Sequence, residues 1–222
     1  MDVQLLGVTP RPERLPALAA KLTHSNTSTE KLEQSSEKEL NTILDYVMKL
    51  GHTSVVEHTS FTFAISGVSR SLTHQLVRHR IASYAQQSQR YVNLENPCFI
   101  IPPKIEKNKE MEKAYEQVMK TIWDQYNKLL EMDIPAEDAR YVLPNATCTN
   151  IIVTMNARSL LNFFELRCCL HAQWEIRQLA NKMLKLVKKE APRIFKEAGP
   201  PCQSKGYCPE HNPDCPLYPK DK

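Results

Sequence analysis

Glycine is scarce in this sequence. The 222 residues include only five glycines, which are Gly7, Gly51, Gly67, Gly199 and Gly206. No two of them lie close enough to build a phosphate-binding loop, so a Rossmann fingerprint and a P-loop are both excluded. If the chain binds nucleotides, side chains and helix amino termini must hold their phosphates. Arginine and serine are therefore the residue types of most interest.

Long apolar runs and an export signal are also missing. No apolar run approaches the roughly 18 residues that a membrane span requires. Residues 1–6 lack a basic region followed by a cleavable apolar stretch, so we expect a cytoplasmic protein. The cysteines number seven, and an odd count without an export signal favours reduced thiols over a disulfide framework.

A strong excess of either charge is absent as well. Lysine and arginine total 29 against 25 aspartates and glutamates, which gives a formal net charge of +4. This balance permits anionic ligands but falls short of the basic footprint of a dedicated nucleic-acid binder. The hydrophobic fraction of 41% is ordinary for a folded chain of a size that forms one core.

Several local patterns predict secondary structure. Ser36 and Glu39 form a capping-box pattern before a helix that Gly51 ends. Residues 61–65 alternate between large apolar and smaller side chains, which predicts a half-buried strand followed by a turn near Gly67. Further helices are expected over residues 71–79, and after Pro135.

The second half of the chain is predicted to be mostly helical. A long amphipathic helix is expected between Pro103 and Pro135, with an apolar stripe of Met111, Ala114, Val118, Ile122, Leu129 and Leu130. Residues 145–154 favour a strand, and residues 156–197 favour two helices that meet near Leu170 and His171. Because no regular βαβ alternation is present, the predicted class is α+β, an antiparallel-sheet core with long helices. One domain is expected over residues 1–198, followed by a proline- and cysteine-rich tail, 199–222.

One cluster of residues suits an anionic ligand. Arg78, His79 and Arg80 are consecutive, and Ser83, Gln86, Gln87, Ser88 and Arg90 follow within ten residues. Arginine offers planar bidentate donors, serine a compact hydroxyl, and glutamine an amide that can read a ring edge. The alternative is that Arg78 and Arg80 only cap the negative end of a helix. The residues alone leave both interpretations open.

Residues 78–91 resemble the signature of the flavin-dependent thymidylate synthases, an Arg-His-Arg triplet followed by a serine after seven intervening residues. Three other segments resemble this family in the same order, namely residues 51–58, 139–144 and 156–173. The resemblance implies methylation of dUMP at ring carbon 5, with 5,10-methylenetetrahydrofolate as carbon donor and NADPH-reduced FAD as hydride source. It also implies a homotetramer with shared active sites, and no cysteine nucleophile, metal, nucleic acid or membrane.

The resemblance also assigns site residues. Contacts to dUMP are implied for Gln75, Arg78, Gln86, Gln87, Ser88, Gln89, Arg90, Arg140 and Arg167. Contacts to FAD are implied for His52, Ser54, Glu57, Arg78, His79, Arg80, Asn156, Arg158, Asn162 and His171. Arg167 is the implied catalytic residue, because an arginine beside N3 and the carbonyl oxygens of the pyrimidine can stabilise the negative charge that develops there.

The same residues have simpler interpretations. Arg167 could be a solvent-facing helix residue, His79 a helix-end imidazole and His171 a core residue at a helix junction. Gln86 stands where some relatives carry an acidic residue, and Ser54 where relatives often carry threonine.

Two further questions stay open from the sequence. Cys202, Cys208, Cys215 and His211 are zinc-ligand types, but their intervals are not a standard paired pattern, so they could equally be ordinary tail residues. A non-catalytic nucleic-acid binder using Arg78, Arg80, Arg90 and lysines of residues 182–196 is an alternative function, as is an inactive nucleotide sensor. Bound yellow flavin that bleaches with NADPH would favour the enzyme.

Overall fold

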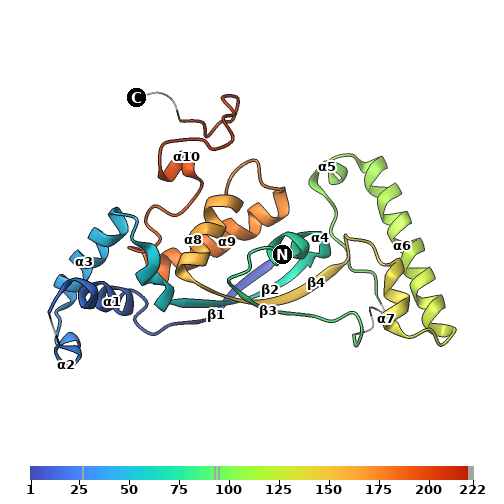
Figure 1. The fold of residues 1–222 in the computed structure, drawn as a ribbon. Helices are drawn as coiled ribbons and strands as arrows, with labels where there is room; N and C mark the ends of the chain where they lie inside the picture. The colour runs from blue at the N-terminus through green and yellow to red at the C-terminus, as the bar shows by residue number, and fades with distance from the viewer. Residues whose placement is uncertain (27, 93, 95, 220–222) are drawn as a thin grey trace. The chain divides into compact units, whose positions relative to one another are not determined.

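The computed structural model describes residues 1–26, 28–92, 94 and 96–219 (Figure 1). In chain order the elements are β1 (Asp2–Val8), α1 (Arg14–His24), α2 (Thr29–Leu32), α3 (Glu37–Lys49), the 3₁₀ helix η1 (Thr53–His58), β2 (Ser60–Ser69), α4 (Arg70–Leu76), β3 (Ser83–Gln86), α5 (Pro103–Glu106), α6 (Lys109–Glu131), α7 (Ala136–Ala139), the 3₁₀ helix η2 (Arg140–Val142), β4 (Cys148–Asn156), α8 (Ala157–Arg167), α9 (Trp174–Glu190) and α10 (Pro201–Ser204).

The strands form an antiparallel sheet in the order β1-β2-β4-β3. This sheet with its long helices confirms the predicted α+β class. The described chain divides into two compact units that interleave along the sequence. Unit 1 contains residues 1–2, 65–78 and 84–152, and unit 2 contains residues 3–64, 79–83 and the chain from 153 onward.

Unit 2 is built on a buried aromatic and aliphatic core. Phe61 of β2 packs edge-to-face on Phe195, with ring centroids 5.5 Å apart, and Phe164 of α8 packs on the same ring at 5.9 Å. α1 lies beside α3, and α8 beside α9 (Figure 1). Burial of such large rings supplies much of the free energy that holds these helices on the strands.

The predicted boundaries of α3 are confirmed. The Ser36 hydroxyl accepts a hydrogen bond from the backbone N–H of Glu39 at 3.3 Å, which satisfies one of the orphan donors at the helix start. Gly51 follows the helix with φ +75°, a left-handed conformation that glycine adopts without the steric cost of a Cβ.

Unit 1 holds the long helix α6, whose predicted buried stripe is wrong. Met111 and Val118 are 57% and 53% exposed, whereas Met119, Trp123 and Tyr126 are buried. The aromatic residues decide this orientation. The Trp123 indole packs near Phe99 and donates its Nε1–H to the carbonyl of Leu94 at 3.0 Å.

Three other boundaries differ from the predictions. β2 continues through Gly67, which adopts φ +63° within the strand and donates its N–H to Asn150 Oδ1 at 3.3 Å, so no turn occurs there. α4 ends at Leu76, so the Arg78-His79-Arg80 triplet lies beyond the helix. β4 begins at Cys148, because residues 144–147 form a turn in which the N–H of Thr147 donates to the Pro144 carbonyl.

The described part of the tail contains one short helix, α10, and is otherwise irregular. Its last three residues, 220–222, lie outside the described part of the chain. Among the helices of the described residues, none has both the length and the apolar composition that crossing a membrane demands.

Candidate active site

The residues predicted to bind nucleotide and flavin divide between the two units. Unit 1 contains the predicted dUMP residues Gln75, Arg78, Gln86, Gln87, Ser88, Gln89, Arg90 and Arg140. Unit 2 contains the catalytic candidate and the predicted FAD residues His52, Ser54, Glu57, His79, Arg80, Asn156, Arg158, Asn162, Arg167 and His171. Two residues do not follow this division. Arg78 lies in unit 1 but was predicted to contact both ligands, and Arg167 lies in unit 2 but was predicted to contact dUMP.

In unit 2, two of the matched sequence blocks meet at a hydrogen bond. Arg167, the last residue of α8, donates its Nε–H to Nε2 of His79 at 3.1 Å. The imidazole also stands edge-on against the Phe163 ring, with centroids 4.9 Å apart. Arg167 is therefore partly buried and engaged in a hydrogen bond.

This environment keeps His79 neutral. Burial, and then the nearby positive charge of Arg167, lower the pKa of His79 from 6.5 to about 4. Because Nε2 accepts from Arg167, the proton of the neutral ring must lie on Nδ1. At neutral pH the site thus presents one permanent cation and an uncharged imidazole.

A second pair connects η1 to α8. Glu57 Oε1 accepts a hydrogen bond from Nη1 of Arg158, and the two side chains form an ion pair. Arg158 and Asn162 are four residues apart on α8, so they lie on the same face of the helix. Three of the predicted FAD residues are therefore close neighbours in the structure.

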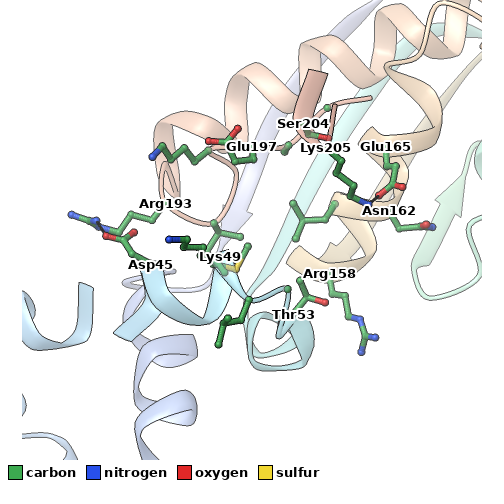
Figure 2. A pocket seen from close by; sticks show the side chains of 18 of the residues that line it. Asp45, Lys49, Thr53, Arg158, Asn162, Glu165, Arg193, Glu197, Ser204 and Lys205 are labelled. Atoms are coloured by element: carbon green, nitrogen blue, oxygen red, sulfur yellow. Dashed lines mark hydrogen bonds and ion pairs between the residues drawn. The ribbon is translucent and has the colours of Figure 1, made fainter. Parts of the chain in front are cut away.

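A cavity of about 1240 Å³ in unit 2 includes this face of α8 (Figure 2). Arg158 and Asn162 line it, and so does Thr53, the residue before Ser54. Its volume exceeds the range of roughly 300–1,000 Å³ that is usual for ligand sites, so a large cofactor would fit. The lining includes the cationic residues Lys49, Arg158, Arg193, Lys196 and Lys205. Such a lining favours an anionic ligand over a cationic one.

The carboxylates at the cavity engage several of these cations. Lys205 Nζ lies 2.8 Å from Glu165 Oε2, and Arg193 Nη1 lies 2.5 Å from Asp45 Oδ2. Figure 2 shows the side chains of both pairs at the cavity. The first pair joins the carboxy-terminal tail to α8.

Two predicted FAD residues have structural partners. The side chain of Asn156 caps α8, because its Oδ1 accepts from the N–H of Ser159 at 2.8 Å. His171 is exposed, with Nδ1 3.6 Å from Glu210 Oε2, so its interpretation as a core residue is wrong. His52, Ser54 and Arg80 are exposed side chains of the same unit.

In unit 1, Glu137 of α7 brings Arg90 and Arg140 together. Nε and Nη2 of Arg90 both lie 2.8 Å from Glu137 Oε2, and Arg140 donates its Nε–H to the backbone carbonyl of Glu137 at 3.0 Å. The Ser88 hydroxyl accepts from the N–H of Arg90 at 3.2 Å. Glu137 was missed by the sequence reasoning, because no motif joins residue 137 to residue 90.

Arg70 was missed as well. Burial, and then the positive charge of Arg140, lower the pKa of the Arg70 guanidinium. Two guanidinium groups at close range repel, and an anion between them would relieve that repulsion. The sequence carried no signal for this pairing.

Two of the predicted glutamines form hydrogen bonds with side chains of α4 and β4. Gln86 donates its Nε2–H to the hydroxyls of Thr73 at 3.1 Å and Thr149 at 3.3 Å, whereas Gln87 Oε1 accepts from Asn150 Nδ2 at 3.1 Å. Gln75 is partly buried on α4.

Comparison with known proteins decides the family. The family model described as thymidylate synthase complementing protein matches residues 4–193. The flavin-dependent thymidylate synthase of Geobacter sulfurreducens is 51% identical over 97% of this chain and 94% of its own length. That of Clostridium tetani is 52% identical over 97% of this chain and 93% of its own length. The chain belongs to the flavin-dependent thymidylate synthase family.

A solved structure shares the fold of this chain. It is that of the UMP/dUMP methylase PolB from Streptomyces cacaoi bound with 5-Br dUMP, with a TM-score of 0.75. The sequence identity is 24%, and the match covers 88% of this chain and 93% of that one. At this identity the likeness shows a shared fold.

The cysteine beside the catalytic candidate is poorly suited to attack a pyrimidine. Burial raises the pKa of the Cys168 thiol to about 12, although the charge of Lys188 opposes the shift. The thiolate is the reactive form, so Cys168 is inert at neutral pH.

Proposed function

We propose that this flavin-dependent thymidylate synthase converts dUMP to dTMP, with 5,10-methylenetetrahydrofolate as carbon donor. FAD, reduced by NADPH, supplies the hydride when it is bound. The observation that carries the proposal is the hydrogen bond between Arg167 and His79, because it joins two family blocks that are 88 residues apart. Both residues belong to segments that resemble the family signature.

Arg167 is proposed as the catalytic residue. A fixed guanidinium can stabilise the negative charge that develops on the pyrimidine when carbon 5 acts as a nucleophile. The neutral imidazole of His79 accepts from Nε and so fixes the orientation of this guanidinium, leaving its two terminal nitrogens as donors for other groups.

The phosphate of dUMP is proposed to bind Arg90, Ser88 and Arg140, with Arg70 as an additional cation. The pairing of Arg90 with Glu137 supports a site of this kind, because it shows that the guanidinium fork can reach an anion. The base and sugar are proposed to be positioned by the remaining residues of this set, which are Gln75, Arg78, Gln86, Gln87 and Gln89. Gln86 acts there as an amide, with no charge-dependent role.

FAD is proposed to bind along the face of α8 that carries Arg158 and Asn162. The volume and cationic lining of the neighbouring cavity fit a ligand with two phosphates. Glu57 positions Arg158, and the remaining proposed contacts are those assigned by the family resemblance, His52, Ser54, Arg78, His79, Arg80, Asn156 and His171.

The assembly is proposed to be a cytoplasmic homotetramer in which several subunits contribute to each pocket. Support comes from α6, whose side chains Met111 and Val118 are left exposed in a single chain and would be buried favourably against another. Residues 1–198 are proposed as the catalytic domain and 199–222 as its tail.

The nucleic-acid alternative receives less support. α9 carries Lys182, Lys185, Lys188 and Lys189 of the lysines that suggested it, but the helix also buries Ile176, Leu179, Ala180, Met183 and Val187. This pattern is that of an amphipathic helix on a core, with solvated lysines on its outer face.

The decisive experiment is tritium release from 5-labelled dUMP. We expect release of tritium and formation of dTMP only with both NADPH and methylenetetrahydrofolate present. Purified protein should be yellow and should bleach on addition of NADPH. A colourless protein that takes up no FAD, and instead binds oligonucleotides in a salt-sensitive manner, would contradict the proposal.

A further inference from the structure

The carboxamide of Gln86 is held by two threonines of unit 1. Its Nε2 lies 3.1 Å from Oγ1 of Thr73 on α4 and 3.3 Å from Oγ1 of Thr149 on β4. Both threonines are buried, with 1% and 4% of their surface exposed, whereas Gln86 at the end of β3 is partly exposed. The amide nitrogen of Gln86 is therefore directed at buried partners.

The hydroxyl of Thr73 decides which end of the carboxamide it meets. This hydroxyl has a single proton, which it donates to the backbone carbonyl of Arg70 at 3.0 Å. Toward Gln86 it can then only accept, so the facing group must be the NH₂. A reversed carboxamide would place Oε1 against an oxygen that has no proton left to give, and both oxygens would lose a hydrogen bond.

The oxygen of the same carboxamide is open to a ligand. Gln86 Oε1 accepts no hydrogen bond from any residue that the structure describes, and it is not buried. Both hydrogens of the NH₂ are taken by Thr73 and Thr149. Gln86 therefore offers a ligand one acceptor and no donor.

A second contact holds β3 against α4. The Tyr84 hydroxyl donates to the backbone carbonyl of Leu76, the last residue of α4, at 2.8 Å. Burial raises the pKa of Tyr84 to about 12, so this hydroxyl keeps its proton at neutral pH. Tyr84 and Gln86 are alternate residues of β3 and point to the same face of the strand. The strand that carries Gln86 is thus fixed to the helix that carries Thr73 at two points.

Gln87 is held in the opposite sense. The N–H of Gly67 donates to Oδ1 of Asn150 at 3.3 Å, and a backbone N–H can only donate. Nδ2 of Asn150 is therefore left to face Gln87, whose Oε1 accepts from it at 3.1 Å. Gln87 thus has its NH₂ available for a ligand, whereas Gln86 has its oxygen available. The orientation of each amide is set by its own partners and does not follow from the residue type.

We propose that Thr73 and Thr149 are positioning residues, which fix Gln86 Oε1 as a hydrogen-bond acceptor for a donor group of dUMP. This inference rests on the proposed function, in which Gln86 belongs to the dUMP site. Outside its phosphate, neutral dUMP has two groups that can donate, the ring N3–H and the 3′-hydroxyl of the sugar. The fixed acceptor selects against an analogue that lacks the donor, because the buried polar partner is then left unpaired.

The same contacts give a reason for an amide at position 86. A carboxylate has no hydrogen to donate, so it would meet the Thr73 oxygen as one acceptor facing another. It would have to turn away from the threonine, and its oxygens would no longer be held in one place. Threonine at 73 and glutamine at 86 therefore suit each other in this chain.

Equilibrium binding of dUMP to the full-length enzyme loaded with FAD tests the proposal. Thr73→Val removes the oxygen that orients the amide, and it should raise the dissociation constant of dUMP about 2- to 13-fold, the range expected for one hydrogen bond. Thr73→Ser keeps the hydroxyl and should restore most of the affinity. An unchanged dissociation constant in Thr73→Val would overturn the proposal.

A matched control separates positioning from a general loss of stability. Thr59 is also buried, and its hydroxyl donates to the backbone carbonyl of Pro12 at 2.6 Å. Thr59→Val removes a comparable buried hydroxyl that has no contact with Gln86, so it should bind dUMP like the parent enzyme. Equal losses of affinity in Thr59→Val and Thr73→Val would contradict a specific role for Thr73.

Two analogues identify the donor and also test the proposal on the unaltered enzyme. N3-methyl-dUMP lacks the ring donor, and 2′,3′-dideoxyuridine 5′-monophosphate lacks the hydroxyl. The analogue without the group that Gln86 binds should bind the parent enzyme more weakly than dUMP does, and Thr73→Val should weaken it no further. Parent enzyme that binds both analogues as tightly as dUMP would overturn the proposal. Equal losses for dUMP and for both analogues in Thr73→Val would do the same.

The parent enzyme distinguishes a failure of this inference from a failure of the proposed function. A parent chain that binds no dUMP and releases no tritium contradicts the proposed function, and the positioning role with it. A parent chain that binds dUMP and releases tritium, while Thr73→Val binds dUMP equally well, overturns the positioning role alone.

Discussion

Arg167 and His79 form one donor–acceptor pair, with the guanidinium Nε–H of the arginine on Nε2 of a neutral imidazole. The histidine belongs to the Arg-His-Arg triplet, whereas the arginine ends α8. The hydrogen bond fixes both side chains. At neutral pH the guanidinium of Arg167 is charged, whereas the imidazole of His79 is not.

Removing that charge should reduce turnover while leaving the fold intact. We expect Arg167→Ala to lose on the order of 10²-fold or more in kcat, because one preorganised donor to the transition state is removed. Arg167→Lys keeps the charge but not the planar fork, so its kcat should lie between those of the parent and of Arg167→Ala. Tritium release measures the effect. Lys182→Ala, an exposed change on α9, is the matched control and should retain full activity.

The neutrality of His79 predicts how stability depends on pH. Its pKa is 6.5 when unfolded and about 4 when folded, so between these values the unfolded chain binds the extra proton. The contribution of His79 is complete above pH 6.5 and is lost as the pH falls towards 4. Melting temperatures should therefore drop less steeply in this window for His79→Gln than for the parent. Identical slopes for His79→Gln and the parent would contradict the assignment.

Glu137 should compete with the phosphate of dUMP for Arg90. The two side chains are about half exposed, and breaking such a pair costs about 0.2–1 kcal/mol, which corresponds to roughly a 1.4- to 5-fold change in affinity. Glu137→Gln should lower the KM for dUMP by about that factor with little change in kcat. Glu112→Gln removes an ion pair on α6 instead and should leave KM unchanged. A raised KM in Glu137→Gln would show that the carboxylate assists binding.

The parts of the fold that depend only on residues close together in the chain could be predicted from the sequence. The capping interaction of Ser36 and the left-handed Gly51 set the ends of α3, because both act within a few residues of the helix. The buried face of α6 could not be predicted in this way. It depends on the packing of Trp123 near Phe99 and Leu94, which only the tertiary structure brings together.

The same distinction applies to the candidate site. The triplet and its serine were recognisable because they are contiguous and match a family signature. Glu137 and Arg70 could not be found, because their relation to Arg90 and Arg140 arises only when unit 1 is folded.

Asn156 should combine a structural and a binding role, and two substitutions can separate them. Its Oδ1 caps α8, so Asn156→Ala should cost about 0.5–2 kcal/mol in the free energy of unfolding. Asn156→Ser retains a capping oxygen and should stay within a few tenths of a kcal/mol of the parent, roughly. It lacks the carboxamide, however, so the proposed contact to FAD should weaken. Denaturant unfolding measures the first effect, and flavin titration of the apoprotein the second. If Asn156→Ser binds FAD as tightly as the parent, the residue is a cap alone and the flavin contact must be assigned elsewhere on α8.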